Sequence, residues 1–314
     1  MSQIVEIDKF NISRIIVKDC MEYSEIANKY SQAFIYDEVL LLSKLIDQND
    51  ADFLMYLKKL LSLDKSCEFE TSMIDLKRSL INLLNSHDLF LDHYKKILKK
   101  IYDNTEKYDY EYLANYYYEN YAGYKLFSDF RNYIQHNKLI DFEIEIRDHF
   151  FDLYIIKDEL FHDKKISRKL DKEIQSNYDF KMSVLIDSWE KSINDFLFYC
   201  LYDLLKITEN SIREYAEYLK NCGVEYNNLN IYLLQSNSRL ISIPKTSIFK
   251  ALKNIKNIDF ITKYSELKEI IEKQKNPHET KFLNMFPEIK KELEKTTNNV
   301  FFIEYMRRFL DPKI

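Results

Sequence analysis

The sequence predicts a predominantly α-helical fold, and three observations support that prediction. The chain of 314 residues contains two glycines and four prolines, so it is poor in the residues that make sharp turns. Apolar residues recur at steps of three and four through most of the chain, which is typical of amphipathic helices. Segments with β-type alternation are short and few. We therefore expect an all-α bundle with one or two small β-hairpins and a helical C-terminal extension.

The N-terminal half shows a series of helical patterns. Apolar residues at helical spacing predict a helix over residues 21–48, and a second helix follows through the segment FLMYLKKLLSL. The pattern resumes over residues 71–102, either as one long helix or as two helices separated near NSHD. The next helix is expected to run without interruption over residues 108–136, through the tyrosine-rich segment YLANYYYENYAGY.

Two segments downstream are typical of β-structure. DFEIEIR at residues 141–147 alternates polar and apolar residues, and FFDLYII at 150–156 is rich in β-forming residues, which together predict a hairpin. NLNIYLLQSNSRLISIPKT predicts a second hairpin that turns at SNS. Helices are expected between the hairpins and again after the second one. We therefore divide the chain into a helical domain over residues 1–222, with the first hairpin inserted near 141–156, and a region over 223–314 of unknown role.

Composition excludes several classes of protein. A Gly-rich phosphate-binding loop needs several closely spaced glycines, and the chain has two in all. The four cysteines form no CxxC pair, so neither a zinc ribbon nor a disulfide framework is expected. The net charge of −5 gives no overall attraction to nucleic acid, so contact with RNA must be local. No apolar run reaches the roughly 18 residues of a membrane span, and no signal peptide is evident, so we expect a cytoplasmic protein without a membrane partner.

The segment FRNYIQHNKL at residues 130–139 crowds polar residues into the end of an apolar helix. At helical steps of three and four, Lys125, Ser128, Asn132 and His136 share one face, while the core stripe occupies the other side. Arg131 lies about 140° away from His136 and reaches this face only by wrapping its long side chain around the helix.

These residue types are suited to RNA cleavage without a metal ion. A histidine with a pKa near 6.5 can take the proton from a ribose 2′-OH. An arginine can bind the scissile phosphate through two N–H groups and stabilise charge in the transition state. An asparagine can orient the imidazole or bind the phosphate. One chain supplies only one arginine, one asparagine and one histidine to the site. A symmetric homodimer that joins two helix ends would supply a second set and complete the site. No cofactor and no metal ion is expected.

The segment FRNYIQH resembles the signature of HEPN domains, in its Arg-Asn-x-x-x-His form at the end of a long helix. The resemblance covers about residues 20–140, and the part up to about residue 222 looks like an extension found in bacterial members. It implies a helical bundle, dimerisation at the motif helix, and metal-independent endoribonuclease activity in toxin, phage-defence or abortive-infection systems. By this resemblance Arg131 and His136 would be the catalytic pair, and Asn132 the supporting polar residue.

One departure from that family bears on regulation. HEPN toxins that are silenced by a nucleotidyltransferase antitoxin carry a tyrosine two residues after the histidine, and this chain has Lys138 there. Control by tyrosine modification is therefore not expected, although a regulatory protein partner or another kind of antitoxin fits the class. Two alternatives stay open. The protein could be a non-catalytic HEPN-like dimerisation or nucleotide-sensing scaffold, or the motif could simply cap a helix whose dipole favours cations at this end.

Lysines near aromatic residues give further candidate contacts. Besides Lys125, Ser128 and Lys138 around the motif, Lys95 and Lys99 in FLDHYKKILKKIY could follow an RNA backbone, or could belong to an ordinary solvated helix face. KTSIFKALKNIK is the longest purely basic stretch and is a candidate RNA or partner contact through four lysines: Lys245, Lys250, Lys253 and Lys256.

Overall fold

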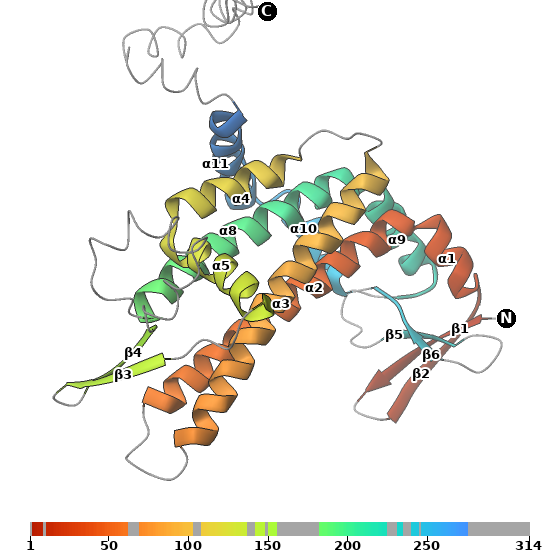
Figure 1. The fold of residues 1–314 in the computed structure, drawn as a ribbon. Helices are drawn as coiled ribbons and strands as arrows, with labels where there is room; N and C mark the ends of the chain where they lie inside the picture. Colours follow the sequence, from red (N-terminus) through yellow and green to blue (C-terminus); the bar gives the residue numbers. More distant parts are fainter. Residues whose placement is uncertain are drawn as a thin grey trace, which may run out of the picture.

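The computed structural model describes residues 2–8, 11–61, 69–102, 108–136, 142–147, 150–155, 182–224, 231–234, 240–244 and 246–275. Helices make up most of this part of the chain, so the predicted predominantly helical fold is confirmed (Figure 1). No helix in the described ranges is both long and apolar enough to cross a membrane.

A long antiparallel helix pair forms one side of the bundle. The short helix α1 (Tyr23–Lys29) leads into α2 (Ser31–Leu61), which packs along α3 (Phe69–Ile101). Side-chain contacts show the antiparallel register, with His93 Nε2 2.6 Å from Glu38 Oε1 and Asn49 donating to the Asn82 carbonyl over 3.3 Å. The helix α3 runs unbroken through NSHD.

The helix expected over residues 108–136 is in fact two helices, so the prediction of one uninterrupted helix was wrong. The chain forms α4 (Asp109–Asn120) and α5 (Ala122–His136), separated at Tyr121, whose backbone is extended (φ −126°, ψ 109°). The Tyr118 hydroxyl, on α4, donates to the Asp129 carboxylate of α5 from 3.0 Å. In one straight helix these residues would lie about 16 Å apart along the axis, so the break is what brings them together.

A close approach between helices accounts for the position of this break. The first turn of α5 packs on α8 (Met182–Ile207), and the Gly123 backbone N–H donates to Ser188 Oγ over 3.2 Å. A Cβ added at Gly123 would lie 2.1 Å from the Leu185 carbonyl oxygen and 2.6 Å from the Trp189 backbone nitrogen. Only a residue without a side chain permits this contact.

The helix α8 runs through the middle of the core. Its residue Trp189 is 1% exposed and packs between aromatic rings of α3 and α5. The next helix, α9 (Glu209–Asn221), ends in a Schellman motif, in which Gly223 has a φ of 81° and Val224 N–H donates to the Leu219 carbonyl over 2.9 Å.

Strands lie at two places on the helical body (Figure 1). One two-stranded sheet pairs β3 (Phe142–Arg147) with β4 (Phe150–Ile155). A four-stranded antiparallel sheet has the order β2-β1-β5-β6 and consists of β1 (Ser2–Asp8), β2 (Asn11–Cys20), β5 (Ile231–Leu234) and β6 (Leu240–Ser242). The strands β1 and β2 were not predicted from the sequence.

The last described helices, α10 (Thr246–Asn254) and α11 (Ile258–Lys275), pack on the bundle. Lysines of α11 form ion pairs with both α4 and α8: Lys268 Nζ lies 2.6 Å and Lys275 Nζ 2.7 Å from the Asp109 carboxylate, and Lys263 Nζ lies 2.6 Å from Asp195. These contacts, and the pairing of β1 with β5, join the described residues after 223 to those before it. The boundary at residue 223 stays a prediction.

Candidate functional site

The motif residues lie in the last turns of α5. This helix contains Arg131 and Asn132 and ends at His136, so steps of three and four still join Lys125, Ser128, Asn132 and His136 along one side of its backbone. The side chains of Asn132 and His136, and the whole of Lys138, lie outside the part of the chain that the structure describes.

Arg131 is held by a partner from another helix. Its guanidinium forms an ion pair with the Asp88 carboxylate of α3, and the two side chains are 30% and 28% exposed. Burial raises the pKa of Asp88, the Arg131 charge opposes that shift, and nearby Asp92 adds to it. The pair fixes the direction of Arg131 and ties the end of α5 to α3. Helical periodicity does not reveal this partner, because Asp88 belongs to a different helix from Arg131.

The other polar residues of this α5 face have local contacts. Ser128 Oγ donates to the Tyr124 carbonyl over 2.7 Å, and Lys125 Nζ lies 5.9 Å from the centre of the Tyr118 ring. Next to them is the buried carboxylate of Asp129, which accepts the Tyr118 hydroxyl. Burial, followed by the charge of Asp129, raises the pKa of Tyr118 above its ordinary value, so this tyrosine stays protonated as the donor.

The two lysines predicted on α3 are not gathered at the end of α5. Lys95 Nζ lies 2.8 Å from Glu111 Oε1 of α4, and this bond raises the pKa of Lys95. Lys95 and Lys99 follow Asp88 by two and three helical turns, which places them about 10 and 16 Å further along α3. Contact with one RNA strand would therefore have to extend well beyond the motif.

A buried histidine of α3 packs against the core-facing side of α5. The His87 ring is 4% exposed and meets three aromatic rings edge-on, with centroid distances of 5.6 Å to Tyr124, 5.1 Å to Trp189 and 6.3 Å to Phe196. Burial lowers the pKa of His87 from 6.5 to about 4, so the ring is neutral at pH 7. Because Tyr124 belongs to α5 and Trp189 to α8, this cluster holds the motif helix against the core.

This histidine makes stability depend on pH. The folded-state pKa of His87 is lower than that of the unfolded chain, so the unfolded chain binds a proton first as pH falls from 6.5 towards 4. The contribution of neutral His87 to the free energy of unfolding is therefore fully present above about pH 6.5. About 2 kcal/mol of this free energy should be lost by pH 5. Urea unfolding at pH 7 and pH 5 measures this loss, and His87→Phe, which keeps an aromatic ring, should not show it.

Wild type must be compared with His87→Phe because the carboxyl group of Asp50 also titrates between pH 7 and pH 5. Burial, then the charges of Glu190 and Asp47, raises the pKa of Asp50 to about 6, which changes stability in the opposite direction. That contribution is present in wild type and variant alike, so it cancels in their difference. Equal losses between pH 7 and pH 5 in the two proteins would show that His87 does not titrate as described.

Within the described residues, no cluster of three or more histidine, cysteine, aspartate or glutamate side chains could hold a metal ion. His93, the other histidine of α3, contacts Glu38. Comparison with known protein families, curated proteins and solved structures gives no match for this chain. The resemblance to HEPN domains therefore depends on the motif residues themselves.

Proposed function

We propose that the protein is a metal-independent endoribonuclease of the HEPN type, which cleaves RNA through the ribose 2′-OH and acts in anti-phage defence or as a toxin. The observation that carries this proposal is the end of α5, where one helix bears Arg131, Asn132 and His136 and a carboxylate of α3 orients the arginine. Arg131 remains partly exposed at this position.

Each residue has a defined role in the proposed reaction. His136 takes the proton from the 2′-OH, and the 2′-oxygen attacks the adjacent phosphorus. The bond from phosphorus to the 5′-oxygen of the next nucleotide breaks, and that oxygen takes a proton from water or from the protonated His136 of the partner subunit. Arg131 binds a non-bridging phosphate oxygen and stabilises the charge that develops on it. A guanidinium has five N–H donors, so pairing with Asp88 and contact with a phosphate are compatible. Asn132 orients the imidazole or binds the same phosphate.

A homodimer would supply the second half of the site. Two copies of the α5 end, related by a two-fold axis, would place two histidines and two arginines around one RNA strand. Lys125 and Ser128 are the candidate RNA contacts on the same face, and Lys138, two residues after His136, is a further one. In a toxin or defence system, such activity would be restrained by a partner protein until it is needed.

Growth on expression is a first test. Inducing the wild-type chain in bacteria should slow growth, because uncontrolled RNA cleavage stops translation, whereas His136→Ala should grow normally at the same protein level. Asn115→Ala, on the exposed side of α4 and outside the motif, is the matched control and should be as toxic as wild type. Equal growth of all three strains with soluble protein would count against the nuclease.

A non-catalytic scaffold is the second candidate, and the Arg131–Asp88 ion pair favours it. An arginine that ties α5 to α3 has a structural role whether or not RNA is cleaved. A dimerisation scaffold should dissociate when the motif face is reversed in charge, for example by Lys125→Glu together with Lys138→Glu. Analytical ultracentrifugation of wild type and of this double variant measures the dimer equilibrium. A change in the equilibrium indicates a scaffold, whereas an unchanged equilibrium indicates that the motif only caps the helix.

A further inference from the structure

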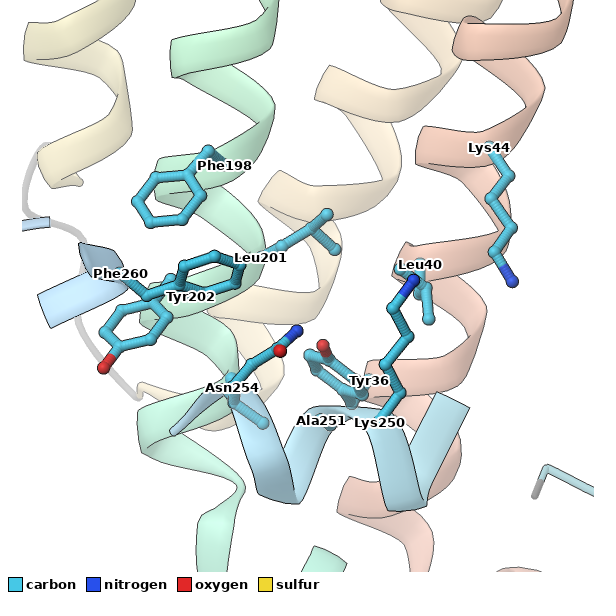
Figure 2. A pocket seen from close by; sticks show the side chains of 11 residues that line it. Tyr36, Leu40, Lys44, Phe198, Leu201, Tyr202, Lys250, Ala251, Asn254 and Phe260 are labelled. Atoms are coloured by element: carbon cyan, nitrogen blue, oxygen red, sulfur yellow. The ribbon is translucent and has the colours of Figure 1, made fainter. Parts of the chain in front are cut away.

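A pocket lies between four helices of the bundle. It has a volume of about 260 Å³ and is bounded by α2, α8, α10 and the start of α11 (Figure 2). Its lining residues are Tyr36, Leu40, Lys44, Phe198, Leu201, Tyr202, Leu205, Lys250, Ala251, Asn254 and Phe260. None of these belongs to α5 or to the motif, so the pocket is separate from the proposed nuclease site.

One side of the pocket is aromatic. Phe198 and Tyr202 of α8 stack with their ring centres 5.7 Å apart, and Phe260 of α11 meets Phe198 edge-on at 5.3 Å. The Tyr202 hydroxyl donates to the Ile255 carbonyl over 3.1 Å, which fixes this ring in place. A rigid aromatic wall of this kind can pack against a planar ring of a ligand.

The other side of the pocket is cationic. Lys44 of α2 and Lys250 of α10 extend their amines on the side away from the phenylalanines (Figure 2). No acidic residue lines the pocket in the described part of the chain. Two positive charges next to an apolar cavity favour a ligand that carries an anionic group, such as a phosphate. Lys250 belongs to the basic stretch KTSIFKALKNIK.

Polar groups lie between these two sides. The Tyr36 hydroxyl and the Asn254 carboxamide approach each other in the middle of the pocket (Figure 2). Burial, and then the charge of Asp37, raises the pKa of Tyr36 to about 12, so its hydroxyl remains a hydrogen-bond donor at neutral pH. An asparagine offers both a donor and an acceptor, which is the pattern needed to bind the polar edge of a heterocyclic base.

We infer that this pocket binds a nucleoside monophosphate. The base would pack against Phe198 and Phe260, its edge would bond Asn254 or Tyr36, and the phosphate would contact Lys44 and Lys250 at the mouth. A cavity of about 260 Å³ is slightly smaller than the roughly 300 Å³ of the smallest pockets for drug-sized ligands, so it has room for the base and sugar of one nucleotide, with the phosphate at its mouth, and not for a dinucleotide. This inference does not rest on the proposed nuclease function.

Calorimetric titration of the full chain tests the inference directly. The probes are AMP, GMP, CMP and UMP, with the matching nucleoside, inorganic phosphate and phenylacetate as comparisons. At least one nucleotide should bind saturably with a Kd below about 1 mM, and its nucleoside should bind at least about tenfold more weakly because the lysines contribute to phosphate binding. The inference fails if no nucleotide saturates in this range, or if phenylacetate binds as tightly as the best nucleotide.

Variants assign the binding to this pocket. Lys250→Glu should weaken nucleotide binding at least about tenfold, and Phe260→Leu should weaken it by a similar factor through loss of stacking. Lys256→Glu is the matched control, since it makes the same charge change on an exposed lysine just after α10 that does not line the pocket, and it should bind as wild type does. Equal effects of Lys250→Glu and Lys256→Glu would overturn the assignment.

Two further measurements separate the inference from the nuclease and identify the source of the ligand. His136→Ala should bind the nucleotide as tightly as wild type, so a failed nuclease assay leaves this result standing. A trinucleotide with a 5′-phosphate distinguishes a free nucleotide from the end of an RNA. If it binds less tightly than the best mononucleotide, the pocket selects free nucleotides; if it binds equally well or more tightly, the restriction to a single nucleotide is wrong.

Discussion

Replacing His136 with alanine should reduce the rate of RNA cleavage by about 10²- to 10⁴-fold, the usual contribution of a general acid or base. The imidazole is the only group of the motif that can exchange a proton near neutral pH, whereas Arg131 and Asn132 cannot take the proton from a 2′-OH. The measurement is the initial rate on a labelled single-stranded RNA, with wild type and variant at equal concentration and equal oligomeric state.

Arg131→Lys gives the companion result for the phosphate contact. Lysine keeps the positive charge but loses the planar fork that would contact the phosphate and the Asp88 carboxylate together, so the rate should fall although the fold persists. Asn115→Ala, on the exposed side of α4 and outside the motif, should retain the wild-type rate. If His136→Ala cleaves RNA as fast as Asn115→Ala, His136 has no part in the reaction.

Replacing Gly123 with alanine should lower the free energy of unfolding by at least about 2 kcal/mol, in spite of the better helix propensity of alanine. The added methyl group would meet backbone atoms, the Leu185 carbonyl oxygen at 2.1 Å and the Trp189 nitrogen at 2.6 Å, and backbone cannot rotate away as a side chain can. The start of α5 would have to move off α8, which would disturb the packing of Trp189.

Urea denaturation measures this effect, and Ala122→Ser is its control. Ala122 is the exposed residue that precedes Gly123 in α5, so its replacement should change stability by less than about 0.5 kcal/mol. A Gly123→Ala protein as stable as wild type would mean that α5 does not approach α8 as closely as described. Since α5 carries the motif, RNA cleavage should decline together with stability.

The sequence predicts the helical character of the chain because periodic apolar residues report directly on helix faces. It does not reveal the break at Tyr121, since the apolar pattern continues across it and the cause is the contact of Gly123 with a helix more than 60 residues later in the chain. The sheet formed by β1 and β5 also depends on pairing between distant segments, which local patterns do not report.

The candidate site likewise has features that depend on one helix and features that depend on contacts between distant segments. The order and spacing of Arg131, Asn132 and His136 on one helix can be read from the sequence, because they depend only on helical periodicity. The partner of Arg131 cannot, since Asp88 comes from α3. The nucleotide pocket likewise depends on four helices, and only Lys250 gave a local signal through its basic segment.

The chemistry of the cut ends tests the central claim most directly. Purified protein should cleave single-stranded RNA in the presence of EDTA and leave a 2′,3′-cyclic phosphate on one fragment and a 5′-hydroxyl on the other, as seen by mass spectrometry. A substrate with a single 2′-deoxynucleotide at the cut site should resist cleavage there. Intact RNA with EDTA, or products that carry 5′-phosphates, would contradict attack by the 2′-OH and with it the proposed role of His136.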